Sequence, residues 1–342
     1  MKSHILIPVF TLAAINISLA QNTISKPVYV YVVGKEYNEA TKHNTIKYWK
    51  NEEAVTVTDG AYNAEPTAIF VTDNNDVYVS GYETRGKTNI AQYWKNSRRI
   101  ALSDATQNAK ANSIFVSGNN VYVSGTINNE PVLWKNNIPQ KLPLNGIKKI
   151  SISSVIVSGS DVYVFGSGNN GEKDILLYWK NGTLTQITDS ASAYAQSAFI
   201  SGNDIYIAGF REIVTIQNGE TMSKRNMAAY WKNGIVHPLS DSLDAIALSI
   251  YVSGNDVYIT GVASDVEKNF FSALYWKNGT LVPVSRSEDA GFNSIYVAGN
   301  DVYMAGGMHP EFNDRAMYWK NGQAVPLSDG SHNAVAIAIT VK

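Results

Sequence analysis

Apolar and polar residues alternate in short runs along most of the chain. In residues 113–144, "SIFVSGNN" and "VYVSG" alternate on either side of a tight turn, and "VLWKNN" and "IPQKLPL" follow after a variable stretch. Alternation with a period of two, bounded by Gly, Asn or Pro, is typical of half-buried β-strands. The pattern predicts units of four short antiparallel strands.

A pentapeptide, "YWKNG" at residues 178–182, recurs almost unchanged along the chain. Every tryptophan lies in this motif, and each is followed by Lys and then Asn: Trp49, Trp94, Trp134, Trp179, Trp231, Trp276 and Trp319. The spacing of 40–52 residues indicates a repeat architecture. The Asn-Gly pair suits a two-residue β-hairpin, because both of its central residues need a positive φ.

Four strands per repeat predict an all-β fold, a seven-bladed β-propeller of four-stranded antiparallel blades. The first unit begins at "VYVYVVG" (28–34) without its first strand, and the chain ends in a lone strand, "NAVAIAITVK" (333–342). We expect the C-terminal strand to complete blade 1 and close the ring, which would protect both sheet edges. A solenoid is the rival architecture, but it needs polar caps at both ends.

One large aromatic residue per blade, at constant register on a strand, indicates packing between neighbouring blades rather than ligand stacking. The lysine after each tryptophan adjoins a hairpin turn and is expected to be solvated. With these motifs the chain resembles secreted bacterial β-propellers, distantly kelch-like in architecture. Gly306-Gly307 is its one Gly-Gly pair, and Tyr adjoins Trp, unlike in kelch units. No functional residue therefore carries over, and the sialidase-type Ser-x-Asp-x-Gly-x-x-Trp box is absent.

The first 20 residues predict export. Lys2, an apolar run and the ending Ser-Leu-Ala are typical of a signal peptide cleaved before Gln21. That run is too short for a membrane span. Residues 21–342 then form a single propeller domain, secreted or periplasmic and expected to be monomeric. A formal charge of −1 argues against nucleic acid binding, and zero Cys means that burial alone must stabilise the fold.

Function is expected on one face of the ring. In a four-stranded meander, the turns after strands one and three lie at one end, and here they are short and repetitive. The connections after strands two and four lie at the other end and vary, as binding loops do. Blade 5 carries an insertion at residues 209–227 that predicts an extra hairpin, either a partner-binding arm or a tolerated insertion.

Two groups of polar residues are candidate ligand-binding positions on this face. The links between blades supply a predicted ring at the channel mouth, which could equally be turn chemistry: Asn63, Asn108, Lys149, Ser192, Asp244, Asp289 and Asn333. Ring closure gathers the second group at the seam of blades 7 and 1: His43, His309, His332, Glu311 and Asp314, with Glu36 and Glu39 on the same loops. Imidazole and carboxylate could hold a metal at the three histidines or perform acid–base chemistry, although the spacing matches no ligand motif and we expect no cofactor.

The leading hypothesis is a binding module for a glycan or a surface protein. Aromatic residues on the variable loops could stack on sugar rings: Tyr37, Tyr82, Phe210, Phe270, Phe271 and Phe312. A glycan-active hydrolase or lyase with a site at the blade 7/blade 1 seam is the alternative, and a structural envelope or matrix protein is the third. Catalytic residues are not assigned.

Overall fold

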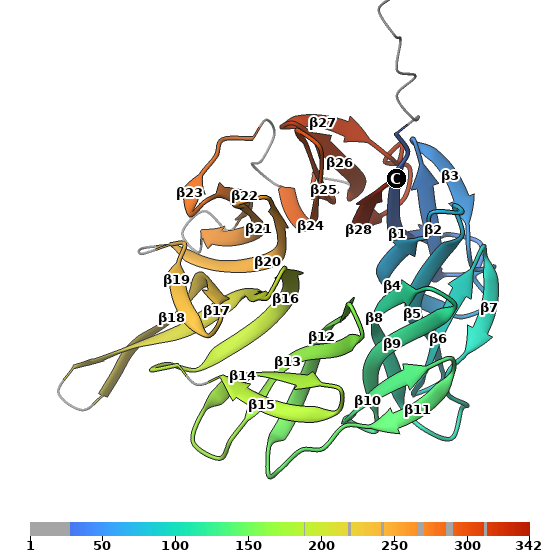
Figure 1. The fold of residues 1–342 in the computed structure, drawn as a ribbon. Helices are drawn as coiled ribbons and strands as arrows, with labels where there is room; N and C mark the ends of the chain where they lie inside the picture. The colour runs from blue at the N-terminus through green and yellow to red at the C-terminus, as the bar shows by residue number, and fades with distance from the viewer. Residues whose placement is uncertain are drawn as a thin grey trace, which may run out of the picture.

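The computed structural model describes residues 28–187, 189–217, 220–240, 243–265, 270–284, 290–310 and 313–342. Its strands form seven four-stranded antiparallel sheets around a ring (Figure 1). In this part of the chain the secondary structure is strand and turn, without helix. The prediction of a seven-bladed β-propeller is confirmed. Residues 1–27, with the predicted signal peptide, lie outside the described residues.

Each blade runs from an inner strand at the ring axis to an outer strand at the rim. Blades 1 to 4 consist of β28 (Ala334–Val341), β1 (Val30–Asn38), β2 (His43–Lys50) and β3 (Glu53–Thr56); β4 (Asn63–Val71), β5 (Val77–Arg85), β6 (Thr88–Lys95) and β7 (Arg98–Ala101); β8 (Ala109–Ser117), β9 (Asn120–Ile127), β10 (Glu130–Lys135) and β11 (Ile138–Lys141); and β12 (Lys148–Ser158), β13 (Asp161–Asn169), β14 (Asp174–Lys180) and β15 (Thr183–Ile187).

Blades 5 to 7 follow the same order. They consist of β16 (Ala193–Ser201), β17 (Asp204–Gln217), β18 (Glu220–Lys232) and β19 (Ile235–Pro238); β20 (Asp244–Ser253), β21 (Asp256–Asp265), β22 (Phe270–Lys277) and β23 (Thr280–Leu281); and β24 (Ala290–Ala298), β25 (Asp301–Met308), β26 (Arg315–Lys320) and β27 (Gln323–Pro326).

The C-terminal strand closes the ring, as predicted. β28 is the inner strand of blade 1 and pairs with β1 from Val341 opposite Val30 to Ala334 opposite Glu36. Backbone hydrogen bonds of 2.6 and 2.9 Å between Tyr29 and Lys342 extend this pairing to the end of the chain. The first and last described segments therefore form one sheet, and no covalent turn joins them.

The recurring tryptophans pack between blades. All seven are among the most buried large side chains of the described residues. Trp276 of blade 6, for example, packs with Ala208 and Ala228 of blade 5. Small residues on one blade thus leave room for the indole of the next, and the structural interpretation of the tryptophans is confirmed.

A β-bulge in each inner strand lies where that strand meets a glycine of the second strand. In blade 6 the register shifts between Ala247 and Ser249, opposite Gly261. A Cβ on Gly261 would lie 2.1 Å from the carbonyl oxygen of Ile246, so only glycine fits this approach. The Ser249 hydroxyl accepts a hydrogen bond of 3.2 Å from the backbone N–H of Ile295 in blade 7, which ties neighbouring inner strands together.

The repeated Trp-Lys-Asn-Gly stretch forms a clasp that joins the third strand to the second. In blade 7, Asn321 has a φ of 50° and Gly322 a φ of 80°, as the hairpin requires. The Asn321 side chain accepts a bond from the Val302 N–H at 2.8 Å and donates one to Asp301 at 2.7 Å. Lys320 pairs with Asp301 at 3.0 Å and lies over the ring of Tyr303.

This clasp explains why the chain repeats the same letters. The lysine predicted to be solvated is only partly exposed and is ion-paired with an aspartate in five blades: Asp76, Asp161, Asp204, Asp256 and Asp301. In blade 3, Asn120 occupies the aspartate position and still accepts from Asn136 at 2.8 Å. An asparagine therefore fits the site without the charge.

The five clasps should make the fold sensitive to acid. Hydrogen bonds from Asn321 and Lys320 lower the pKa of Asp301, and the matching residues lower the pKa of the other four aspartates. A carboxyl group with a lowered folded-state pKa contributes stability above its unfolded pKa of about 3.9, and this contribution is lost as pH falls through the folded value. Replacing all five aspartates by asparagine should flatten the decline of the thermal midpoint below about pH 4. An unchanged acid limb in calorimetric scans would contradict this.

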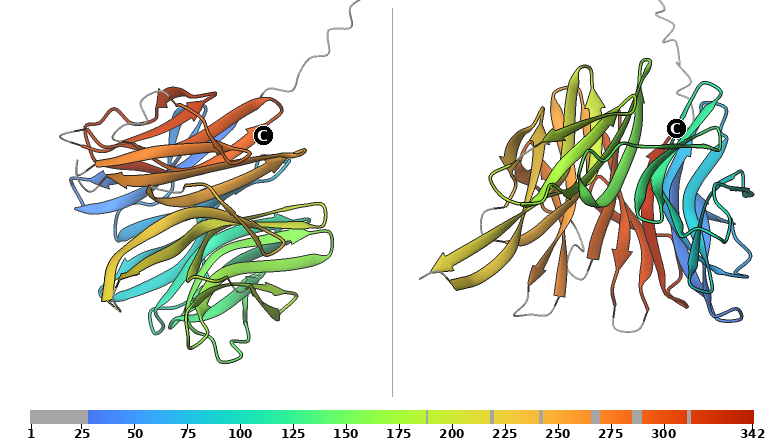
Figure 2. Two further views of the ribbon diagram at one scale, coloured as in Figure 1. Left: turned by 90° about the vertical axis from the view of Figure 1, so that its left-hand side faces the viewer. Right: turned by 90° about the horizontal axis from the view of Figure 1, so that it is seen from below.

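The variable connections gather at one end of the blades, opposite the clasps, because the sheets are antiparallel meanders. The blade 5 insertion is the extra hairpin that the sequence predicts: β17 and β18 remain paired to Gln217 and Glu220 and extend beyond the other blades (Figures 1 and 2). Within the described residues no helix has the length and apolar character needed to cross a membrane.

Candidate functional site

A polar cavity of about 460 Å³ lies on the variable face at the seam of blades 7 and 1. Blade 1 forms one wall, and the link from blade 7 brings His332 to the other side. The lining residues are Glu36, Tyr37, Asn38, Glu39, Ala40, Thr45, Lys47, Thr56, Thr58, Asp59 and His332. A hydrogen bond of 2.8 Å from the Tyr37 N–H to the Asn333 carbonyl holds the two sides together.

Strand alternation directs the side chains of blade 1 into this seam. Trp49 packs against blade 7, and residues two and four positions earlier on β2 point to the same side. These are Lys47 and Thr45. On β1, Glu36 shares a side with Val32, which also packs toward blade 7. The seam therefore receives polar side chains at its open end and apolar ones near its centre.

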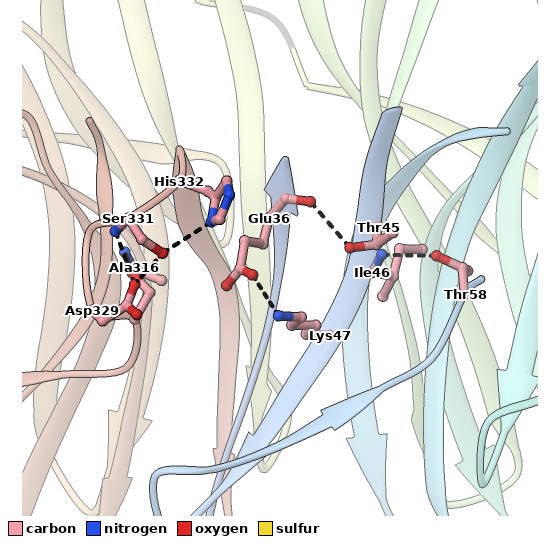
Figure 3. A network of polar contacts seen from close by, with 10 residues as sticks. Glu36, Thr45, Ile46, Lys47, Thr58, Ala316, Asp329, Ser331 and His332 are labelled. Atoms are coloured by element: carbon pink, nitrogen blue, oxygen red, sulfur yellow. Dashed lines mark hydrogen bonds and ion pairs between the residues drawn. The ribbon is translucent and has the colours of Figure 1, made fainter. Parts of the chain in front are cut away.

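Hydrogen bonds fix both walls of the cavity (Figure 3). The Lys47 ammonium pairs with the Glu36 carboxylate at 2.5 Å, and each side chain is only 22% exposed. The Thr45 hydroxyl donates to the Glu36 carbonyl at 3.1 Å. On the link, the Ser331 hydroxyl donates to Asp329 at 2.6 Å and lies 2.9 Å from Nδ1 of His332.

The cavity has more negative than positive groups. Three carboxylates line it, from Glu36, Glu39 and Asp59, against the single ammonium of Lys47. A hydrogen bond from Lys42 lowers the pKa of Glu39, so this carboxyl group is ionised at neutral pH. The Asp59 carboxylate accepts a bond of 3.0 Å from the Ala61 N–H. Such a cavity offers many hydrogen-bond acceptors and disfavours anionic ligands.

Within the described residues, the other six blades have no charged side chain at the position of Lys47. At the position of Lys47, two residues before the tryptophan, blades 3 to 7 have buried apolar residues: Val132, Leu177, Ala229, Leu274 and Met317. Blade 2 has Gln92 there, and its Glu83 contacts Arg85 at 3.1 Å. The seam of blades 4 and 5 holds Arg211 against Asp189 at 2.7 Å, with both side chains buried or nearly so.

The predicted histidine cluster does not form one site. Nδ1 of His43 lies 2.9 Å from the Gly60 carbonyl, on the link to blade 2. His309 contacts Asp314 at 2.9 Å, within its own connection, while His332 lines the cavity. Among the described residues no group of three His, Cys, Asp or Glu side chains is arranged to hold a metal. Glu311 lies outside the described residues.

Four of the predicted ring residues bind backbone groups of the preceding blade. Their side-chain oxygens accept from a backbone N–H within or next to its third strand, at distances of 2.9 to 3.0 Å: Asn63 from Asn44, Asn108 from Asn89, Asp244 from Asn226 and Asn333 from Asp314. These bonds join neighbouring blades, so the side-chain oxygens of these four residues already have hydrogen-bond partners within the protein. Ligand binding by the ring stays a prediction, and Asp289 lies outside the described residues.

The loop aromatics have separate surroundings. Tyr37 lines the cavity, whereas Tyr82 lies under Lys110 and Phe210 stacks on Tyr194 at 4.7 Å between ring centres. The side chains of Phe270 and Phe271 and the whole of Phe312 are outside the described residues. Lys47 was missed by sequence reasoning. The sequence does mark Lys47, because it is the one charged residue two positions before a tryptophan. The other six repeats have an uncharged residue at that position.

Comparisons with known proteins identify the fold. Neither a family profile nor a curated sequence matches the chain. Among solved structures, the β-propeller domain of the Trilobed protease from Pyrococcus furiosus, described as having an open velcro topology, has 13% identity and a TM-score of 0.53 over 89% of this chain and 93% of that one. In this chain, by contrast, β28 closes blade 1.

Two peptidases also contain a similar propeller. The Pyrococcus horikoshii acylaminoacyl peptidase has 13% identity and a TM-score of 0.52, and an acylaminoacyl peptidase in complex with a chloromethyl ketone has 13% and 0.53. Each match covers 89% of this chain and 51% of the peptidase, so this chain spans about half of their length. At such identities the likeness shows a shared seven-bladed β-propeller fold and no shared activity.

Proposed function

We propose that this chain is an exported glycan-binding module whose ligand occupies the cavity at the seam of blades 7 and 1. One observation carries the proposal: blade 1 places Glu36, Lys47 and Thr45 around a cavity of about 460 Å³, and Lys47 stands where blades 3 to 7 have buried apolar residues. That volume falls in the usual range for small-ligand sites. Polar groups at a packing position cost stability, so a retained ligand contact is their simplest explanation.

The lining suits a hydroxyl-rich ligand. Carboxylates accept hydrogen bonds from sugar hydroxyls, threonine hydroxyls both accept and donate them, and charged acceptors make the stronger bonds. Tyr37 supplies an aromatic ring at the same cavity. The excess of carboxylates favours neutral or amino sugars over uronic acids, since an anionic sugar would lie near Glu36, Glu39 and Asp59.

The test is calorimetric titration of residues 21–342 with neutral, amino and acidic oligosaccharides. Tyr37→Ala should weaken binding of the best sugar by about tenfold, because stacking and hydrophobic contact with an aromatic ring contribute on the order of 1–2 kcal/mol. Tyr62→Ala is the matched control, since Tyr62 is exposed on the next link and lies against Arg85 outside the cavity. Equal losses in both variants, or tightest binding of a uronate, would refute the assignment. A silent panel would redirect the search to a surface protein.

A glycan hydrolase or lyase is the second candidate, favoured by carboxylates and an imidazole in one cavity. Hydrolysis needs one carboxylic acid with a raised pKa to protonate the leaving group. The pKa of Glu39 is instead lowered by Lys42, and a hydrogen bond from Ser331 lowers that of the nearby Asp329. Neither of these two carboxyl groups therefore suits the role of general acid, and release of reducing ends from the bound sugar would make hydrolysis the preferred role. Export itself is tested by a mature N-terminus at Gln21.

A further inference from the structure

We propose that a second cavity, at the seam of blades 2 and 3, binds an uncharged and largely apolar small molecule. This blade 3 cavity has a volume of about 500 Å³ and is lined by residues of β9, β10 and β11 with Gln107 from the preceding link. It is independent of the sugar site proposed above.

The two cavities occupy equivalent places in the repeat. Counting from the tryptophans, Val132 corresponds to Lys47, Glu130 to Thr45 and Lys141 to Thr56. Gln107, one residue before Asn108, matches His332, one residue before Asn333. Both cavities therefore open on the variable face between a blade and the link from its predecessor.

The chemistry of the two cavities differs at the positions of Glu36 and Lys47, although the blade 3 cavity is also lined by polar residues, namely Gln107, Asn128, Glu130 and Lys141. Ile127 replaces Glu36 and Val132 replaces Lys47, so the ion pair of the first cavity becomes an apolar floor in the second. Val132 is 2% exposed, and Pro131 and Pro139 add further apolar surface. Removing a ligand's apolar surface from water against such a floor is favourable.

The charges at this cavity cancel. Glu130 and Lys141 form an exposed ion pair of 3.0 Å, and the same two residues also line an adjoining cavity that contains Leu142, Pro143 and Leu144. The pair thus lies between two apolar surfaces. The pair therefore has no net charge that would attract a charged ligand, and such a ligand would lose more hydration than an uncharged one on entering the cavity.

The experiment uses N-phenyl-1-naphthylamine, an uncharged probe whose fluorescence rises in apolar surroundings, titrated into residues 21–342. Saturable binding at one site per chain is expected. Pro139→Glu places a carboxylate on the exposed wall and should weaken the probe's affinity by about tenfold or more, since an apolar ligand would have to desolvate it. Ala54→Glu is the matched control, because Ala54 holds the equivalent exposed position at the seam of blades 7 and 1.

A second variant tests the same cavity at a position outside the strands, so that a loss of binding cannot be attributed to misfolding of a strand. Gln107→Trp fills the mouth from the exposed link without altering a strand, and it should also reduce binding while the thermal midpoint stays unchanged. An anionic relative of the probe, 1-anilinonaphthalene-8-sulfonate, should bind more weakly. Absence of saturable binding, equal weakening by Ala54→Glu, or tighter binding of the sulfonate would overturn the proposal.

Discussion

Deleting residues 333–342, which include β28, should abolish cooperative folding. The strand buries Ala334, Ala336, Ile339 and Val341, and it supplies the inner edge of blade 1. Burial of each large apolar side chain contributes about 1.5–3 kcal/mol, and the lost backbone pairing adds to this. The total approaches the whole stability of a typical domain, about 5–15 kcal/mol. Circular dichroism during heating should show a broad transition or none.

A circular permutant distinguishes the effect of losing ring closure from the effect of shortening the chain. Moving residues 333–342 in front of Val28, joined by a short Gly-Asn turn, would turn the bonds between Lys342 and Tyr29 into an ordinary hairpin like those of the other blades. New termini on an exposed link are usually tolerated. The permutant should regain a cooperative transition near that of the parent chain. A deletion variant that melts like the parent would show that six blades and the remnant of blade 1 suffice.

Much of this fold could be predicted, because two separate features of the repeat indicate the same architecture. The period of the tryptophans counts the blades, and the incomplete ends of the chain show how the ring closes. The blade 5 hairpin was predicted from an insertion around a single Asn-Gly pair. The clasp was not, since the pairing of Lys320 with Asp301 joins two turns that are about 20 residues apart in sequence. Only the register of β25 against β26 brings them together.

The site was predicted less well, and the reason lies in side-chain direction. Sequence placed His43, His309 and His332 on neighbouring connections, which is correct at the level of the backbone. Successive strand residues point to opposite sides, however, and a bulge shifts the register, so a shared loop does not imply a shared cavity. His332 lines the cavity, while His43 turns to the Gly60 carbonyl. Comparing the residue two positions before each tryptophan would have found Lys47.

Replacing the ion pair at the seam of blades 7 and 1 by apolar residues like those of other blades should preserve or raise stability while weakening sugar binding. The double variant Glu36→Ala/Lys47→Leu removes the ion pair and places at the seam a leucine, as at Leu177 and Leu274. Replacing a largely buried ion pair by apolar residues is often neutral or stabilising, here by up to about 1 kcal/mol, which corresponds to a few degrees in the thermal midpoint. Sugar binding should fall by at least about tenfold, because hydrogen bonds to charged groups contribute about 1.5–3 kcal/mol each.

The control is the ion pair at the matching seam. Glu130→Ala/Lys141→Leu removes an exposed pair at the blade 3 cavity and should leave sugar affinity unchanged, because it alters a different seam. Proteins commonly retain groups at binding sites that weaken the fold, and replacing them gains stability at the expense of function. A seam variant that binds sugar normally would remove the ion pair from the site. If the thermal midpoint of the Glu36→Ala/Lys47→Leu variant fell by several degrees, Glu36 and Lys47 would be stabilising the fold. The polar residues at this seam would then be explained without a ligand.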